Sequence, residues 1–233
     1  MAKLKRYLAP KFWQLHKKGK KLTVSPSPGP HKKFESIPLQ VLLTNVLKIA
    51  YLGSEARKII KKGEILVDGK VRKDHAYPVG IFDVVSIPKI KKNYRILPKG
   101  NGLAPIEISE KEASTKICKI VNKTKFKGNR LQLNLHDGKN ILVDKDVYKT
   151  GDSILIELPN LKIIDHIKLE KGCLGLVTKG KNIGKLGKVK DIIPGEFKNP
   201  KRVICEIGEK STEVLMEHFF VVGKDKPVLK LGE

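Results

Sequence analysis

The sequence predicts an α+β fold that is predominantly β. Beyond residue 64, most of the chain consists of short runs that alternate apolar and polar residues between Gly-containing turns, a pattern typical of antiparallel strands. Two helical patterns stand together within residues 39–62, and the first 36 residues are too basic and proline-rich to form a core. With 40% hydrophobic residues in 233, the chain can bury the cores of two or three small domains.

The charge balance points to a polyanionic partner. The chain has 48 Lys and Arg residues against 24 Asp and Glu, a formal net charge of +24 and a pI of about 9.9. Such an excess repels itself in a compact state unless a polyanion neutralises it. We therefore expect a nucleic-acid partner, with an anionic membrane surface as the weaker alternative. Aromatic residues make up only 6%, so backbone and groove contacts are expected to outweigh base stacking.

The cysteines and apolar runs indicate the compartment. Cys118, Cys173 and Cys205 are scattered without a C-x-x-C spacing, which favours reduced, buried thiols over a metal or redox site. No apolar run approaches the roughly 20 residues that span a bilayer, and the start MAKLKRYLAP lacks the apolar segment of a secretory signal. A cytoplasmic protein is expected.

Residues 1–36 are predicted to be a basic arm. They contain ten Lys or Arg residues and no acid before Glu35, and the prolines of Ser25–Pro30 exclude a regular helix or central strand. A solvated tail and an arm that orders only on a polyanion both fit this composition. The net charge favours the second, with Phe12, Trp13 and Leu15 as packing anchors.

A compact domain is predicted over residues 37–93. Leu39–Ala50 has the spacing of a buried helix, and Ser54 is the expected N-cap of a second helix that stops at Gly63. Asp68-Gly69 predicts a hairpin turn. The second helix and the hairpin together favour a phosphate-binding surface over a merely solvated face. Their seven cations are Arg57, Lys58, Lys61, Lys62, Lys70, Arg72 and Lys73.

This order of elements resembles the alpha-L RNA-binding motif of small-subunit ribosomal proteins, tyrosyl-tRNA synthetases and pseudouridine synthases. The matching residues are Leu39, Leu42, Ser54-x-Ala56-Arg57-x-Ile59-Ile60, Gly63-x-Ile65-x-Val67-Asp68-Gly69-Lys70-Val71 and Pro78-Val79. The family usually has Gly-Asp before its last strand, whereas this chain has Gly80-Ile81-Phe82-Asp83, so we expect a different turn there.

Residues 94–168 are predicted to form a small central β domain. Its strand patterns surround a second turn at Asp137-Gly138, and it is the least basic part of the chain. We see no chemistry in it.

Residues 169–233 contain a stretch with two interpretations. Gly175-x-x-x-x-Gly180-Lys181-Asn182 is one residue short of a phosphate-binding P-loop, but Asn182 replaces the hydroxyl that holds magnesium. Gly184 and Gly187 stand where the P-loop helix would run. Two strands joined by a glycine-rich loop fit better, with further strands at 202–207, 212–216 and 219–223.

The glycine spacing of this loop, followed by Lys188-Val189, resembles the KOW motif of ribosomal proteins and transcription elongation factors. That resemblance implies an SH3-like barrel whose loop contacts RNA.

No catalytic constellation is evident. The six histidines show neither an i, i+4 pair nor a Cys at ligand spacing, and nucleophile-elbow and dinucleotide motifs are absent from the sequence. We expect no enzyme activity, no metal and no cofactor.

The combination of arm, alpha-L module, β domain and KOW barrel resembles one family along nearly the whole chain: the fourth small-subunit ribosomal protein of the archaeal and eukaryotic type. Further matches are Ala9-Pro10-Lys11-x-Trp13, Gly29-Pro30-His31-Lys32 and Asp165-His166-Ile167-Lys168, and the short end after Leu231 is closer to archaeal members. The resemblance implies a structural constituent of the small ribosomal subunit that binds folded rRNA beside neighbouring ribosomal proteins, without a membrane or small-molecule substrate.

A KOW transcription elongation factor or another ribosome-associated RNA-binding factor is the alternative, whereas an RNA-modifying enzyme would need a catalytic domain that residues 94–168 are too short to supply. The residues expected to contact RNA are Lys17, Lys18, Lys20, Lys21, His31, Lys32, Lys33, Arg57, Lys58, Lys61, Lys62, Lys70, Arg72, Lys179, Lys181 and Lys185.

Overall fold

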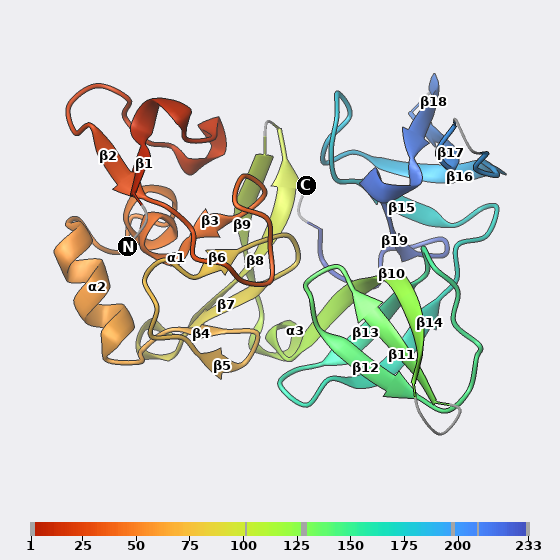
Figure 1. Ribbon diagram of the computed structural model, residues 1–233, viewed down its shortest axis with the longest axis horizontal. Coiled ribbons are helices and arrows are strands. Elements are labelled where there is room, and N and C mark those ends of the chain that lie inside the picture. The colour runs from red at the N-terminus through yellow and green to blue at the C-terminus, as the bar shows by residue number, and fades with distance from the viewer. Residues whose placement is uncertain (1–2, 101, 127–129, 197–198, 209, 232–233) are drawn as a thin grey trace. The chain divides into compact units, whose positions relative to one another are not determined.

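The computed structural model describes residues 3–100, 102–126, 130–196, 199–208 and 210–231 (Figure 1). The chain divides into two compact units, which are described separately below. The first unit is Met1–Leu97 with Asn101–Lys116, and the second is Pro98–Gly100 with Ile117–Glu233.

The first unit is built on a five-stranded sheet with the strand order β5-β4-β7-β8-β9. Its strands are β4 (Leu66–Val67), β5 (Lys70–Val71), β7 (Val84–Ile87), β8 (Lys92–Lys99) and β9 (Gly102–Ile108). Two small antiparallel pairs accompany it, β1 (Lys3–Lys5) with β2 (Leu22–Val24) and β3 (Ile37–Pro38) with β6 (Pro78–Val79). Strands β8 and β9 were predicted to belong to the central domain. They lie in this sheet instead, because β8 continues the ladder by pairing with β7.

The helices of the first unit are short. The α-helices are α1 (Leu39–Val41), α2 (Gly53–Lys61) and α3 (Glu110–Ala113), and the remaining turns are η1 (Arg6–Leu8), η2 (Lys11–Trp13), η3 (Leu42–Val46) and η4 (Pro88–Ile90). The single helix predicted over 39–50 is wrong beyond Val41, where the backbone widens into the π-helical η3. The Leu47 amide donates to the Leu42 carbonyl five residues back, and the Thr44 hydroxyl donates to the Gln40 carbonyl.

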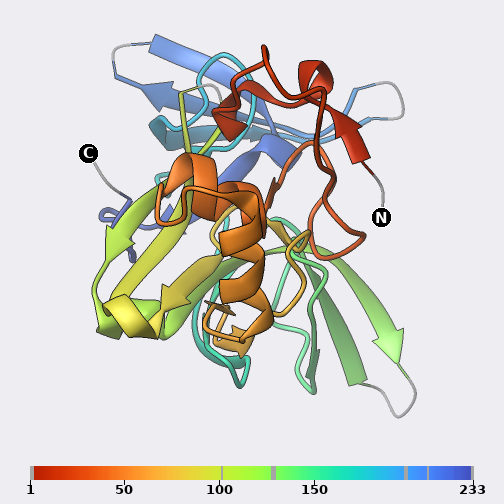
Figure 2. The ribbon, with the colours of Figure 1, turned by 90° about the vertical axis from the view of Figure 1, so that its left-hand side faces the viewer.

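Helix α2 agrees with the sequence except at its cap. Ala56 and Ile60 are fully buried, and Gly63 has a φ of +80°, the left-handed conformation that ends many helices. Ser54 is not the N-cap, because the helix begins two residues earlier than predicted, at Gly53, and Leu52 takes the N-cap position without a side-chain hydrogen bond. Figures 1 and 2 show α2 on the outer side of the first unit, away from β8 and β9.

The sequence predicted the turn between β4 and β5 correctly, but it predicted only that the turn before β7 would differ from that of the family. Asp68 and Gly69 both have positive φ, 52° and 72°, so the predicted β4–β5 hairpin turn is confirmed. Before β7, Phe82 also has a positive φ of 61°, and the Asp83 carboxylate accepts a hydrogen bond from the Gly80 amide at 2.8 Å. The departure from Gly-Asp at this point therefore lengthens a turn that Asp83 closes.

The N-terminal arm is packed onto the first unit. Leu4, Ala9 and Trp13 belong to the same buried core as Ile37 and the helices, and the Trp13 indole N–H donates to the Ser36 carbonyl at 2.9 Å. The prediction that this segment orders only on a polyanion is wrong for the described residues, because Leu4, Ala9 and Trp13 anchor it in the core.

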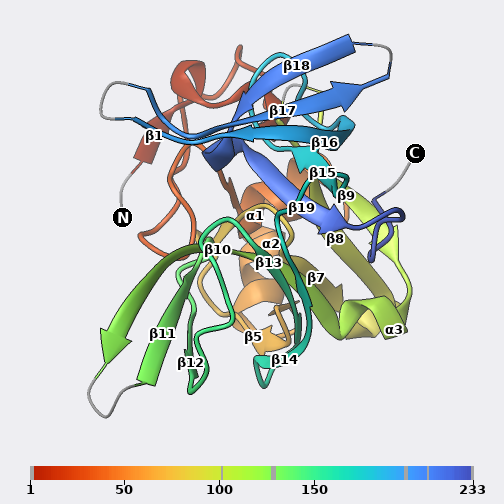
Figure 3. The same ribbon diagram turned by 90° about the vertical axis from the view of Figure 1, so that its right-hand side faces the viewer.

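The second unit contains two five-stranded sheets with orders β12-β11-β10-β13-β14 and β18-β17-β16-β15-β19. The strands of the first sheet are β10 (Thr115–Phe126), β11 (Arg130–Leu135), β12 (Asn140–Val143), β13 (Ser153–Glu157) and β14 (Lys162–Ile167). Those of the second are β15 (Leu174–Val177), β16 (Leu186–Ile193), β17 (Arg202–Ile207), β18 (Lys210–Leu215) and β19 (Phe219–Gly223), with the turn η5 (Met216–His218) before β19. Figure 3 shows β16, β17 and β18 side by side.

The buried side chain of Lys119 connects β10 to the segment of η5 and β19 in the second unit. Its side chain leaves β10 and its ammonium group donates to the Met216 carbonyl and, at 2.8 Å, to the Phe219 carbonyl. Burial lowers the pKa of Lys119 to about 8, although the Glu217 carboxylate partly opposes the shift.

Two further predictions concern the whole chain. Cys118, Cys173 and Cys205 are buried thiols, as the sequence indicated, and none of them forms a disulfide. No helix in the part of the chain that the structure describes is long and apolar enough to cross a membrane.

Candidate nucleic-acid interface

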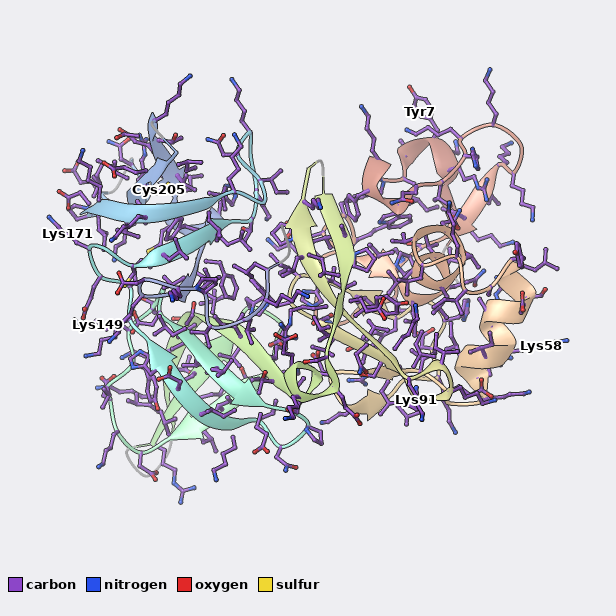
Figure 4. All side chains as sticks on the ribbon, turned by 180° about the vertical axis from the view of Figure 1, so that it is seen from behind. Tyr7, Lys58, Lys91, Lys149, Lys171 and Cys205 are labelled. Carbon is purple, nitrogen blue, oxygen red and sulfur yellow. The ribbon has the colours of Figure 1, made fainter. Side chains whose placement is uncertain are left out.

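Helix α2 presents a cationic outer face. Ala56 and Ile60 point into the core and Ile59 packs against it, which leaves the basic residues on the opposite side of the helix. In Figure 4 the labelled Lys58 side chain points away from the helix into the surroundings. The exposed cations of this element are Arg57, Lys58, Lys61 and Lys62. Four positive charges on two turns form a surface that attracts phosphate groups.

The adjacent hairpin contributes one exposed cation and one that is partly structural. Lys70 is exposed, whereas Arg72 is half-buried and its guanidinium lies 4.5 Å from the centre of the Tyr77 ring. Burial, together with the nearby Asp83 carboxylate, raises the pKa of Tyr77 to about 12, so the phenol stays neutral beneath the guanidinium. Arg72 therefore stabilises the fold of the hairpin as well as adding positive charge.

The arm adds exposed lysines that a folded backbone holds in place. The β1–β2 pair and the hydrogen bond from the Arg6 amide to the Lys21 carbonyl, 3.1 Å long, close the loop that carries most of them. The exposed lysines predicted in the arm are Lys17, Lys18, Lys20, Lys21, Lys32 and Lys33.

His31 lies in the interior, contrary to the prediction that it contacts RNA. Its side chain is 6% exposed, and its Nε2 lies 3.0 Å from the Asp83 carboxylate. The ring rests on the Gly80 backbone, where an added Cβ would come within 2.3 Å of it. The segment Gly29-Pro30-His31 is therefore structurally important, because His31 attaches the arm to the turn before β7.

Asp83 belongs to a buried cluster of charges that the sequence did not reveal. The Lys116 ammonium lies 2.6 Å from the Asp83 carboxylate and 2.7 Å from that of Asp68, and its side chain is completely buried. Burial alone would raise the pKa of Asp83, but the charges of His31 and Lys116 and the Gly80 amide outweigh it and hold this pKa far below its ordinary range. Through Lys116 at the start of β10, the cluster thus joins the arm, the hairpin turn and the start of β7.

The arm and α2 meet at an open cavity of about 750 Å³ in the first unit. Lys3, Arg6 and Lys20 line it from the arm, and Arg57 lines it from α2. The prediction included Lys20 and Arg57 but omitted Lys3 and Arg6, because only the folded arm brings them next to α2. The only signal in the sequence was their place in the first basic run.

His75 lines the same cavity. Burial, followed by the charge of Arg57, lowers the pKa of His75, with Lys61 acting in the same direction and Asp74 opposing it. A neutral imidazole is therefore favoured here, one that can both donate and accept a hydrogen bond.

The glycine-rich loop of the second unit is a strand connection. It joins the antiparallel strands β15 and β16, and Gly180 and Gly184 take positive φ of 93° and 81°. The predicted strands are confirmed, and the P-loop interpretation fails because β16 stands where its helix would be. Lys181 and Lys185 are exposed and Lys179 is half-buried. These three cations belong to the second unit.

One group in the second unit has metal-ligating side chains. The ligand atoms of Cys118, His136 and Asp137 lie within 4.8 Å of one another. Each is engaged by the protein: Asp137 pairs with Lys139 at 3.0 Å, the Cys118 thiol faces the same carboxylate at 3.9 Å, and the Lys119 amide donates to His136 Nδ1 at 3.3 Å.

Family models match the chain in three segments. They are the RS4NT (NUC023) domain over residues 2–34, the S4 domain over residues 37–85 and ribosomal family S4e over residues 90–163. The S4 match falls on α1, α2 and the β4–β5 hairpin, so the chain is an S4-domain protein with a cationic S4 surface.

Similar proteins cover almost the full chain. Small ribosomal subunit protein eS4 of Methanothermobacter thermautotrophicus is 46% identical over 230 residues, 98% of this chain and 95% of the relative. The protein of the same name from Archaeoglobus fulgidus is 47% identical over 232 residues, 98% and 97% of the two chains. The crystal structure of the 30S ribosomal protein S4e from Thermoplasma acidophilum superposes with a TM-score of 0.72 at 26% identity, covering 85% of this chain and 99% of that one. The chain belongs to the ribosomal S4e family.

Proposed function

We propose that this chain is a structural constituent of the small ribosomal subunit, where it binds and stabilises folded small-subunit rRNA beside neighbouring ribosomal proteins. One observation carries the proposal: relatives named small ribosomal subunit protein eS4 are 46–47% identical over 98% of the chain. A transcription elongation factor, the alternative raised by the KOW-like loop, is not favoured by these relatives. The proposed location is the cytoplasmic ribosome.

The mechanism is phosphate neutralisation by a prefolded surface. Each cation that replaces a condensed counterion on RNA adds affinity that falls with salt, by roughly 0.7–0.9 log units per log unit of salt for each phosphate contacted. The surface consists of the exposed arm lysines, the outer face of α2 and Lys70, with Lys181 and Lys185 as a separate contribution from the second unit. Specificity comes from the shape of the folded RNA.

We further propose a four-part organisation: the arm of residues 1–36, an S4 domain from residue 37 whose sheet is extended by β8 and β9, a central β domain that begins with β10 and ends at residue 168, and an SH3-like KOW barrel of 169–233. The sheet order β18-β17-β16-β15-β19 supports the barrel, since four sequential antiparallel strands are followed by a fifth that returns to pair with the first of them.

The test is the salt dependence of rRNA binding by the full chain. Purified small-subunit rRNA is titrated with wild-type protein and with the double variant Arg57→Glu/Lys61→Glu between about 50 and 200 mM salt, the range over which phosphate contacts weaken strongly. Both residues are exposed, but Arg57 also donates a hydrogen bond to Gln40 at 2.9 Å, so the fold of the variant is checked by circular dichroism before binding is compared. Arg72 is left unchanged because it stacks on Tyr77.

We expect the double variant to bind more weakly at low salt, and its log–log slope to fall by about 1.4–1.8 if both side chains contact phosphate. The matched control is Lys91→Glu/Lys111→Glu, two exposed lysines of the first unit outside the proposed surface. Equal slopes for the wild type and the α2 variant would show that this face is merely solvated.

A further inference from the structure

The cavity between the arm and α2 has an apolar rim that the fold does not use. Tyr51 is 95% exposed and Leu52 is 61% exposed, and both line the cavity, as does the 43% exposed Leu22. Single exposed apolar side chains are ordinary on protein surfaces, but three that line one cavity together offer an apolar surface to a ligand.

The rim is held in a fixed position. The Tyr51 backbone amide donates to the Glu55 carboxylate at 3.0 Å, which attaches the residue to the first turn of α2. Behind it, Gln40 lies so close to Gly53 that an added Cβ would stand 2.3 Å from its amide nitrogen, and Gln40 accepts a hydrogen bond from Arg57 at 2.9 Å. The aromatic ring is therefore presented by an ordered backbone and loses little freedom on binding.

The charge around the cavity selects the ligand. Four cations line it, Lys3, Arg6, Lys20 and Arg57, against one carboxylate, Asp74. An anionic group is therefore attracted to the cavity. Asn45 also lines it, and because the Asn45 side-chain oxygen accepts from the Thr44 hydroxyl at 2.7 Å, its NH₂ group is the part that can donate to a polar ring. An apolar face, a polar edge and an anion in one ligand are the chemistry of a nucleotide.

Size separates an unpaired nucleotide from a duplex. A volume of about 750 Å³ lies within the range of roughly 300–1,000 Å³ typical of sites for small ligands. One base with its sugar and phosphate fits such a volume, whereas paired bases inside a helix do not enter it. Sequence-sensitive RNA recognition typically uses bases that are splayed out and stacked on aromatic side chains.

We propose that this cavity captures one unpaired nucleotide of the bound RNA, with the base against Tyr51 and Leu52 and the phosphate beside Arg6, Lys20 and Arg57. The inference rests on the proposed function, because it assumes that the first unit lies on RNA. Such a cavity would let the protein distinguish RNA with an unpaired nucleotide from a continuous duplex, whereas the rest of the surface recognises phosphate alone.

The experiment compares two synthetic RNAs: a short, fully paired duplex, and the same duplex with one unpaired adenosine in its middle. Binding of the full-length wild type, Tyr51→Ala and Tyr51→Phe is measured for each RNA at one salt concentration. The matched control is Tyr7→Ala, because Tyr7 is 78% exposed in the arm but does not line the cavity.

The wild type should bind the bulged RNA more tightly than the paired one, by about fivefold to a hundredfold, the effect of stacking one base. Tyr51→Ala should bring the ratio close to one while leaving affinity for the paired duplex within about twofold, since the cations are untouched. Tyr51→Phe and Tyr7→Ala should keep the wild-type ratio.

Two outcomes overturn the proposal and are distinct from each other. If the wild type binds both RNAs equally, or if Tyr51→Ala keeps the preference for the bulge, the cavity takes no nucleotide, while RNA binding itself stands. If the wild type binds neither synthetic RNA and also fails to bind purified small-subunit rRNA, the proposed function fails together with this inference.

Discussion

Removing the buried ammonium group of Lys116 should destabilise the first unit strongly. In the variant Lys116→Met, two carboxylates that are 8% and 2% exposed, those of Asp68 and Asp83, lose a cation at 2.7 and 2.6 Å. Taking one partner from a buried ion pair costs about 3–5 kcal/mol, because the remaining charge stays out of water. The variant should lose that much of the free energy of unfolding, a large share of the roughly 5–15 kcal/mol of a typical domain.

The assay is guanidinium unfolding followed by the fluorescence of Trp13. This residue is the only tryptophan in the chain and is fully buried in the core of the first unit, so its signal reports that unit alone. The control is Lys111→Met on α3, an exposed lysine of the same unit, which should change stability by less than about 0.5 kcal/mol. A loss below about 1 kcal/mol in Lys116→Met would refute the view that the cluster holds the arm, hairpin and β7 together.

Three further predictions use the pH and packing of the two units. Because the folded state lowers the pKa of Asp83, its stabilisation is complete above the ordinary value near 4 and fades in acid, so Trp13 fluorescence should show wild type and Asp83→Asn converging in stability as the pH falls below about 4. A constant difference between them down to about pH 2 would contradict this. The pKa of Lys119 is about 8 in the folded state and near 10.4 in the unfolded chain, so between these pH values the unfolded chain binds more protons than the folded one. The free energy of unfolding of the wild type should therefore rise with pH over this range, relative to that of Lys119→Met. The assay is chemical labelling of the buried thiols of the second unit, which become reactive on unfolding. Equal pH profiles would show that the buried amine does not titrate there. Gly175→Ala would place a Cβ 2.0 Å from the Phe219 ring and should cost about 1–3 kcal/mol in the same thiol assay, whereas unchanged labelling would mean that the ring moves aside freely.

The sequence predicted the features that local chemistry determines. The Asp68-Gly69 turn followed because both positions take positive φ, and the outer face of α2 followed because Ala56 and Ile60 fix which side is buried. The P-loop could also be excluded from neighbouring residues alone, because Asn182 lacks the required hydroxyl and Gly184 and Gly187 disfavour the required helix.

Features that depend on distant partners were not predictable. Lys116 meets Asp83 and Asp68 across 33 and 48 residues of chain, and nothing in its own neighbourhood distinguishes it from an exposed lysine. His31 reads as another cation of the arm until Gly80 and Asp83 enclose it. The π-helical turn after Val41 is hidden in the same way, because apolar spacing predicts a buried face and not the width of the backbone turn.

The measurement that tests the proposed function most directly is sedimentation of the tagged protein from its native lysate on a sucrose gradient, with and without ribonuclease. A structural constituent held by rRNA should migrate with the small ribosomal subunit and leave that fraction after digestion. Migration at the top of the gradient, or together with RNA polymerase, would contradict the assignment and favour a transcription factor instead.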